Sequence, residues 1–352
     1  MKMKYAAVAS ICVLAVLCSS ASVLFASDSD ADAAVYDGYY KNQLTSKQVD
    51  IYTALTGLTP SVAIEGNETD GYYITVSCTG LTSDDLNDIE RAWFATKLEA
   101  SEASNWAFWA WNTTGVKAAI TNIDASGFRI GIDAAFKDGF ADKVTAVTNA
   151  VNAAAEKITG DSDSKKVKSI NSILTGKGYG YVDTNEAHVF ANTVYAFAAP
   201  ENDTCYMTSF AYSAAFKALC TKAGVASIQV YGFFGDQSKL FAWNEVLVED
   251  KVYGVDCATN ATSKNKEQWL CAGAYTAVDG NAYSKVHIAF PYSVACGLTS
   301  QFSVDRINNE GYSWPADNSI VAKLTQYAPW ILVGIICAIM AIALVYMAKR
   351  GD

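Results

Sequence analysis

An uncharged apolar run near the C-terminal end constrains this chain more than any other feature. Residues 330–348, WILVGIICAIMAIALVYMA, carry no charge and are long enough to cross a bilayer as one helix. Lys349 and Arg350 follow directly. A helix that is apolar on all sides at a chain end has nothing to cover it in water. The sequence therefore predicts a transmembrane helix at 330–348.

A second apolar segment occupies residues 1–26, where Lys2 and Lys4 precede an uncharged run. This pattern is typical of a secretory signal peptide. The run is also long enough for an uncleaved N-terminal anchor, and both interpretations remain open. Basic residues that flank membrane segments stay in the cytoplasm. We therefore expect a single-pass protein of the cell membrane, with residues 27–328 outside the cell.

The composition of the chain excludes some classes of partner. Its net charge is −10, and an acidic surface repels nucleic acid and anionic lipid head groups. The sequence contains no C-x-x-C pair, so we predict no metal site, and no motif indicates a cofactor. We expect no nucleic-acid partner. The membrane is the one partner that the sequence itself indicates.

Cysteines and sequons also fit an exported chain. An even number of cysteines lies outside the apolar ends, which favours disulfide bonds in an extracellular protein. They are Cys78, Cys205, Cys220, Cys257, Cys271 and Cys296. Pairing of Cys205 with Cys220 or Cys257 would be an example. N-x-[ST] sequons occur at Asn67, Asn112, Asn202 and Asn260.

Residues 36–160 mix helical and strand patterns, which predicts an α+β region. The helices are expected at 44–58, 82–98 and 143–158, and the strands at 71–78, 105–114 and 126–136. The tryptophans of NWAFWAWNTT favour a packed β-core, because aromatic residues prefer strands. A sugar-binding platform is the alternative. The polar stretch ITGDSDSKK is the expected boundary before a second domain at 161–310, which opens with a helix at 165–174.

The second domain contains a helix followed by a β-meander. One apolar face of TCYMTSFAYSAAFKALCTKA predicts a helix that ends at Gly224. Strands are expected at 226–234 and 241–250, with a hairpin tip at Asp250 and Lys251 and a return strand at 252–259. The chain therefore places a helix against three consecutive strands.

The motifs in this half resemble the transglutaminase-like (papain-related) superfamily. YSAAFKALCTKAGV, FAWNEV and VYGVD follow one another in the order and at the spacing of that family, and KKVKSINSIL and AHVFANTVYAF resemble its lead-in helices. The resemblance covers about 165–262. It implies a core in which a helix packs on an antiparallel sheet.

The resemblance also assigns catalytic positions, and two of the three are substituted. The nucleophile position holds Ser209, the histidine position holds Phe241, and the orienting acid is retained as Asp256. Active members of the family use a thiolate that an imidazole activates. Without that imidazole, Ser209 is an ordinary alcohol, Asp256 has nothing to orient, and Phe241 is expected to close the pocket over Ser209. We expect none of the three to act in catalysis.

Other ionisable residues offer few substitutes. Cys205 lies four positions before Ser209 and is the alternative nucleophile if it is not in a disulfide. The two histidines, His188 and His287, are more typical of satisfied structural residues than of a base. Glu245 and Asp250 are expected to face water.

Three functions remain open on this sequence. The first is a non-catalytic domain on the outer cell face that binds a peptide, a glycan or another envelope protein, or that serves as a structural element. The second is a divergent cysteine amidase, protease or transglutaminase that uses Cys205, or Ser209 with a relocated base. The third is an adhesin whose contact surface is the tryptophan-rich stretch. The state of the Cys205 thiol separates the first two.

Overall fold

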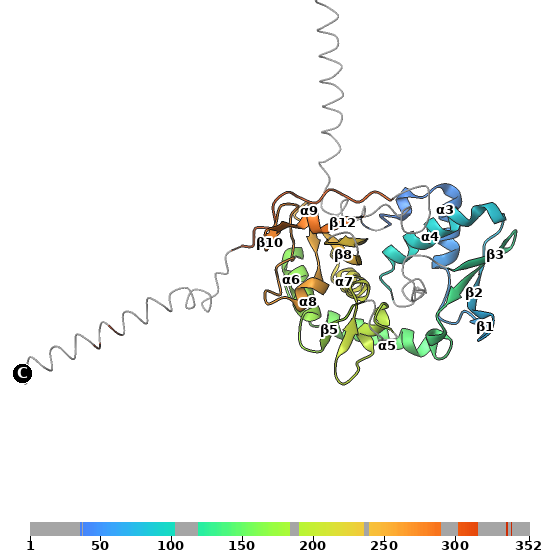
Figure 1. Cartoon of the computed structure of the whole chain (residues 1–352), viewed down its shortest axis with the longest axis horizontal. Coiled ribbons are helices and arrows are strands. Elements are labelled where there is room, and N and C mark those ends of the chain that lie inside the picture. The colour runs from blue at the N-terminus through green and yellow to red at the C-terminus, as the bar shows by residue number, and fades with distance from the viewer. Residues whose placement is uncertain are drawn as a thin grey trace, which may run out of the picture. The chain divides into compact units, whose positions relative to one another are not determined.

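The structure is a computed structural model that describes residues 36, 38–102, 119–183, 190–235, 239–289, 302–315, 336 and 339. Met1–Gly311 form one compact unit and Tyr312–Asp352 a second. The described residues mix helices and antiparallel sheets, which confirms the α+β class (Figure 1). None of the helices described is both long enough and apolar enough to span a bilayer. Apart from Ile336 and Ile339, both apolar end segments lie outside the described residues.

A first antiparallel sheet and two helices form the N-terminal part. The strands β1 (Glu65–Asn67), β2 (Gly71–Ser77), β3 (Ile120–Asp124) and β4 (Gly127–Ile132) lie in the order β1-β2-β4-β3. Helix α3 (Ser46–Thr56) begins at a capping box of Thr45 and Gln48, within the predicted range 44–58. Helix α4 (Leu86–Glu99) follows a 3₁₀ turn at Ser83–Asp85. The tryptophan-rich stretch 105–114 lies outside the described residues.

The predicted strand at 126–136 is shorter in the structure than in the sequence pattern. It ends at Ile132, and Ala134–Phe136 form a 3₁₀ helix. The carboxylate of Asp133 accepts a hydrogen bond from the Ala135 amide at 2.9 Å, which offers the backbone an alternative to strand pairing. Helices α5 (Phe140–Ala155) and α6 (Asp163–Leu174) then follow close to the predicted ranges.

A second antiparallel sheet organises the C-terminal half. Its strands are β7 (Ser227–Phe234), β8 (Lys239–Val248), β9 (Lys251–Val255) and β12 (His287–Ala289), in the order β12-β7-β8-β9. The β8–β9 hairpin turns at Glu249 and Asp250, whose φ angles are 50° and 59°, so Lys251 already belongs to β9 and the expected tip was one residue late. A two-residue hairpin of this kind needs positive φ at both central positions.

Helix α7 (Ser209–Ala223) lies along this sheet, as the family resemblance implies (Figure 1). Gly224 ends the helix with a φ of 68°, as predicted. Two buried hydrogen bonds fix the helix on β8. The Ser213 hydroxyl donates to the carbonyl of Trp243 at 3.0 Å, and the Asn244 amide donates to the carbonyl of Ser213 at 3.1 Å. The N-terminus of α7 is thereby held beside the start of β8.

Shorter elements surround this core. They are 3₁₀ helices at Lys41–Gln43 and Val194–Ala198, parallel strands β5 (Tyr179–Tyr181) and β6 (Cys205–Met207), helices α8 (Cys257–Thr262) and α9 (Tyr283–Val286), and the hairpin of β10 (Ala277–Val278) and β11 (Asn281–Ala282). The segment that resembled a lead-in helix, 187–197, contains only that 3₁₀ turn among its described residues. His188 lies outside them.

The predicted disulfide pairings are wrong. All five described cysteines of the external region are free thiols, namely Cys78, Cys205, Cys220, Cys257 and Cys271. Cys205 and Cys257 each have a local acceptor. The Cys205 thiol donates to the carbonyl of Phe197 at 3.4 Å, and the Cys257 thiol donates to the side-chain oxygen of Asn171 at 3.5 Å. Four of the five, all except Cys78, are buried, since a thiol packs as a small apolar side chain.

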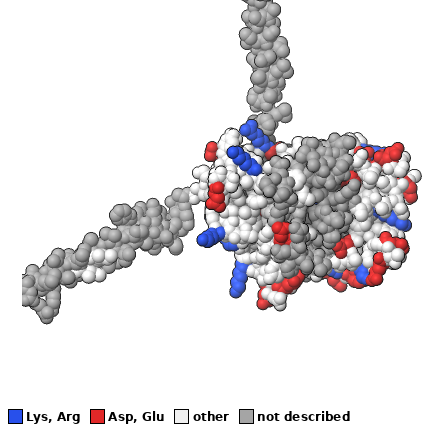
Figure 2. All heavy atoms as spheres, viewed as in Figure 1, with Lys and Arg blue, Asp and Glu red and all other residues white. Residues whose placement is uncertain are grey.

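Acidic and basic side chains are spread over the surface in the view of Figure 2, where acidic groups dominate the lower and right-hand parts. This distribution agrees with the net charge of −10.

Candidate functional site

The position of the family nucleophile lies at the first residue of α7. Ser209 is 1% exposed, and its hydroxyl oxygen accepts a hydrogen bond from the Ala242 amide at 3.2 Å. The preceding residue, Thr208, is also fixed, because its amide and hydroxyl both donate to the carbonyl of Ala191, at 2.8 and 3.1 Å. The Ser209 side chain is therefore buried where α7 meets β8, away from solvent.

Phe241 occupies the histidine position and belongs to an aromatic cluster. Its side chain is 3% exposed. The ring stacks on Phe234 with centroids 4.9 Å apart and lies 6.4 Å from the ring of Tyr181. The β7 residue opposite Phe241 is Gly232. A phenyl ring cannot accept or deliver a proton, so the side chain at position 241 has no acid–base function.

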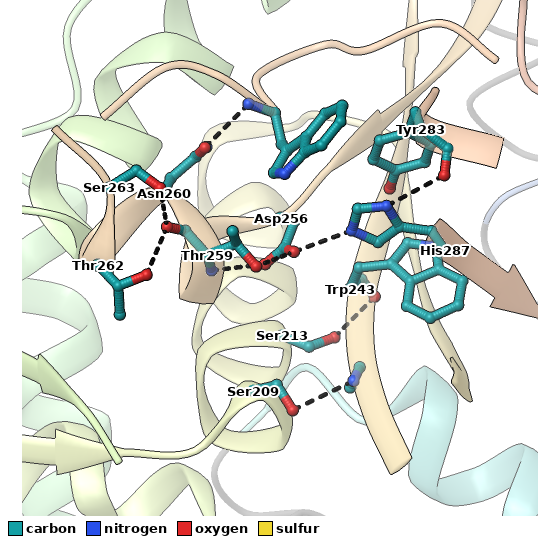
Figure 3. A network of polar contacts seen from close by, with 12 residues as sticks. Ser209, Ser213, Trp243, Asp256, Thr259, Asn260, Thr262, Ser263, Tyr283 and His287 are labelled. Carbon is teal, nitrogen blue, oxygen red and sulfur yellow. Dashed lines mark hydrogen bonds and ion pairs between the residues drawn. The ribbon is translucent and has the colours of Figure 1, made fainter. Parts of the chain in front are cut away.

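Asp256 does have an imidazole to hold, which corrects the sequence-based expectation. The carboxylate is fully buried after β9 and caps α8, where it accepts from the Thr259 amide at 2.9 Å and from the Thr259 hydroxyl at 2.5 Å. Its second oxygen also lies 2.9 Å from Nε2 of His287 (Figure 3). The two side chains are both 0% exposed. The partner of the retained acid therefore comes from β12, 31 residues further along the chain.

His287 is enclosed by four aromatic rings. The Tyr283 ring stacks on the imidazole with centroids 3.8 Å apart and an angle of 14°. The rings of Phe234, Trp243 and Trp269 meet it edge-on at 5.1, 5.2 and 5.5 Å. The other ring nitrogen, Nδ1, lies 3.3 Å from the carbonyl oxygen of Tyr283. Both nitrogens therefore face hydrogen-bond acceptors of the protein.

This arrangement lacks the geometry that a general base requires. In a nucleophile–histidine–acid triad, one ring nitrogen is held by the acid and the other faces the nucleophile. In His287 the second nitrogen faces a backbone carbonyl instead. Figure 3 shows Ser209 and His287 on separate hydrogen bonds, with Ser209 directed at β8 and His287 at Asp256. An acid and an imidazole are present, but they do not serve Ser209.

Cys205 does not resemble an activated nucleophile. Its side chain is buried in β6, and its thiol donates to a backbone carbonyl. Burial raises the pKa of the Cys205 thiol above its usual value. Reactive cysteines have the opposite property, a pKa lowered by a nearby positive charge or a helix N-terminus.

Glu245 is buried, and the expectation that it faces water is wrong. It is 5% exposed, and burial, followed by the negative charge of Asp305, raises the pKa of its carboxyl to about 8. Its β9 neighbour in the sheet is Gly254, and a Cβ on that glycine would lie 2.4 Å from the hydroxyl of Tyr283. The phenol of Tyr283 therefore lies against the sheet at Gly254. Asp250 is exposed, as expected.

No group of three or more His, Cys, Asp or Glu side chains that could hold a metal ion occurs among the residues that the structure describes.

Comparisons with known proteins add little to this geometry. No family model matches the chain, and no curated protein matches it. One solved structure, described as "Crystal structure of a TGase", is similar with a TM-score of 0.27 and 14% sequence identity. The similarity covers 40% of this chain and 44% of that chain, so this chain spans less than half of the protein it matches. A similarity of this size carries no argument about activity.

Proposed function

We propose that this chain is a membrane-anchored protein whose external region contains a degenerate, non-catalytic transglutaminase-like domain. The order and spacing of YSAAFKALCTKAGV, FAWNEV and VYGVD support the family. The packing of α7 on an antiparallel sheet agrees with it. The domain acts by binding a peptide, a glycan or another envelope protein, or as a structural element of the envelope.

The engagement of both nitrogens of His287 carries the non-catalytic part of this proposal. The acid position of the family site has an imidazole, yet that ring is enclosed by aromatic side chains and its second nitrogen faces the Tyr283 carbonyl. The Ser209 hydroxyl accepts a hydrogen bond from the backbone of β8. Loss of one positioned acid–base group alone typically costs about 10²–10⁴-fold in rate.

A divergent enzyme that uses Cys205 is less well supported. Such an enzyme needs an accessible thiol of lowered pKa, whereas the Cys205 thiol is buried and its pKa is raised.

An assay of the purified chain in detergent tests the non-catalytic proposal. Incorporation of a fluorescent amine into a glutamine-containing peptide, and hydrolysis of peptide amides, should both stay at the level of the Ser209→Ala and Cys205→Ala variants. Turnover by the unmodified chain that either variant abolishes would contradict the proposal and favour the divergent enzyme.

The location of the chain is tested separately. Protease added to intact cells should digest the external region and leave a fragment that contains the C-terminal apolar segment. Protection of the whole chain in intact cells, with digestion after lysis, would contradict the external location.

A further inference from the structure

The sequons of this chain differ sharply in their surroundings. Asn67, Asn202 and Asn260 lie among the described residues, and Asn112 does not. An N-linked glycan is bulky and needs an asparagine side chain at the surface. The structure can therefore rank the three described sequons by the accessibility of the amide nitrogen.

Asn202 lies at the tip of a tight hairpin. Asn202 and Asp203 are the two central residues, with φ angles of 49° and 65°, and both are exposed. Glu201 and Thr204 close the turn through two backbone hydrogen bonds of 2.8 and 3.1 Å. Asparagine and aspartate tolerate this left-handed conformation better than most residues. The backbone is therefore rigid, while the Asn202 side chain projects from a two-residue tip.

Asn67 lies at the end of β1, where the chain turns toward β2, and is exposed. Its side-chain oxygen accepts hydrogen bonds from the amides of Thr69 and Asp70, at 2.8 and 3.0 Å. Its side-chain nitrogen donates to the carboxylate of Asp70 at 2.8 Å. The amide is at the surface, but a local Asx turn uses both of its polar atoms. We rank Asn67 below Asn202 for this reason.

Asn260 is an internal control because its side chain is fully buried in α8. Its nitrogen donates to the side-chain oxygen of Asn171, and its oxygen accepts from the Trp269 amide, both at 2.9 Å. A glycan on this amide would break both hydrogen bonds and would have no space in the folded domain.

We propose that Asn202 and Asn67 carry N-linked glycans and that Asn260 does not. The proposal rests on the external location proposed above, where a polyprenyl-diphosphate-linked glycan is the donor. The Asn Nδ2 forms a bond to C1 of the first sugar, and the bond between C1 and the diphosphate oxygen breaks. The amide loses one proton, and the lipid diphosphate leaves. Both asparagines are exposed and have a Thr hydroxyl two residues later, at Thr204 and Thr69, and the Asn67 nitrogen must first leave Asp70.

Peptide mass mapping of the full chain, purified from membranes of the cells that naturally produce it, tests this inference. The peptides with Asn202 and Asn67 should carry hexose or hexosamine mass, at higher occupancy on Asn202, and the peptide with Asn260 should carry none. Thr204→Val and Thr69→Val should each remove the added mass from their own site only, with Thr262→Val as the matched control without effect.

Unmodified Asn202 and Asn67, or a glycan on Asn260, would overturn the inference. Protease digestion of the same intact cells shows whether the external location has failed as well. An unmodified chain that is digested leaves the proposed location intact, whereas an unmodified chain that is protected contradicts both proposals.

Discussion

Asp256 and Ser209 are the acid and nucleophile positions that the family resemblance assigns, and their surroundings in the structure differ. Asp256 accepts hydrogen bonds from Thr259 and contacts the imidazole of His287, so its buried carboxyl group is well partnered. Ser209 accepts a hydrogen bond from the Ala242 amide of β8, next to Phe241. Asp256 therefore contacts an imidazole, whereas the hydrogen bond of Ser209 comes from the backbone.

A buried carboxyl group and a buried hydroxyl differ in what it costs to lose a hydrogen-bond partner. A buried carboxylate is costly unless it is paired and hydrogen-bonded, so removing its imidazole without replacement would destabilise the fold. A serine hydroxyl needs only an ordinary hydrogen bond. His287 connects β12 to the N-terminus of α8 through Asp256. We therefore interpret the Asp256–His287 pair as a structural connection.

Of the substitutions considered, replacing Asp256 should lower the free energy of unfolding the most. Asp256→Ala leaves His287 buried without its acid and removes the cap of α8. Breaking a buried pair in this way typically costs about 3–5 kcal/mol. Chemical denaturation at neutral pH should show a loss of that order in the free energy of unfolding.

Asp50→Ala, on the exposed side of α3, is the matched control and should change the free energy by less than about 0.5 kcal/mol. If Asp256→Ala costs no more than Asp50→Ala, the pair is not a structural connection.

Glu245 provides the contrasting case of a buried carboxyl with a raised pKa. In the folded chain its pKa is about 8, against a usual value of 4.5. The folded state therefore binds the proton more tightly. The contribution of this group is fully present below about pH 4.5 and is lost as the pH rises through about 8. Glu245→Gln stays neutral, so it should gain stability relative to the unmodified chain as the pH rises, by up to about 4 kcal/mol.

Denaturation curves at pH 5 and pH 9 measure this difference, with Glu102→Gln at an exposed site as the control. A difference between Glu245→Gln and the unmodified chain that is the same at both pH values would show that Glu245 is ionised in the folded state at pH 5.

Introducing the cysteine and histidine of the family at positions 209 and 241 tests whether these positions lie side by side. In Ser209→Cys with Phe241→His, the new imidazole should lie beside the thiol and lower its pKa. Iodoacetamide should then label residue 209 about tenfold faster at neutral pH than in Ser209→Cys alone, because the thiolate is the reactive form. Mass spectrometry of the residue 209 peptide separates this label from that of the other thiols. Equal rates in a folded double variant would contradict the assignment of Phe241 to the histidine position.

Local patterns predicted the elements around this site well. The stop at Gly224 and the β7–β8–β9 meander both depend on residues close together in the sequence. The family motif also placed Ser209 and Phe241 on the elements where the structure has them. Their chemical roles remain proposals.

The partner of Asp256 could not be predicted, because it depends on contacts distant in sequence. His287 lies on a three-residue strand outside the motif, and only its pairing with β7 brings it to the acid. Glu245 was misassigned for a related reason. An acidic residue on a strand predicts exposure, but Glu245 is buried and lies near Asp305, which is distant in the sequence. The disulfide prediction failed because the count of cysteines contains no information about distance.

NMR of the His287 ring nitrogens tests directly whether this imidazole is hydrogen-bonded to Asp256 or to Ser209. Long-range ¹H–¹⁵N spectra of the ¹⁵N-histidine-labelled chain, assigned with His287→Gln, report the hydrogen-bonding environment of Nδ1 and Nε2. We expect Asp256→Asn to shift these resonances strongly and Ser209→Ala to leave them unchanged, since the imidazole contacts the acid and not the hydroxyl. Resonances that move with Ser209→Ala would show that His287 reaches Ser209 and would contradict the non-catalytic account.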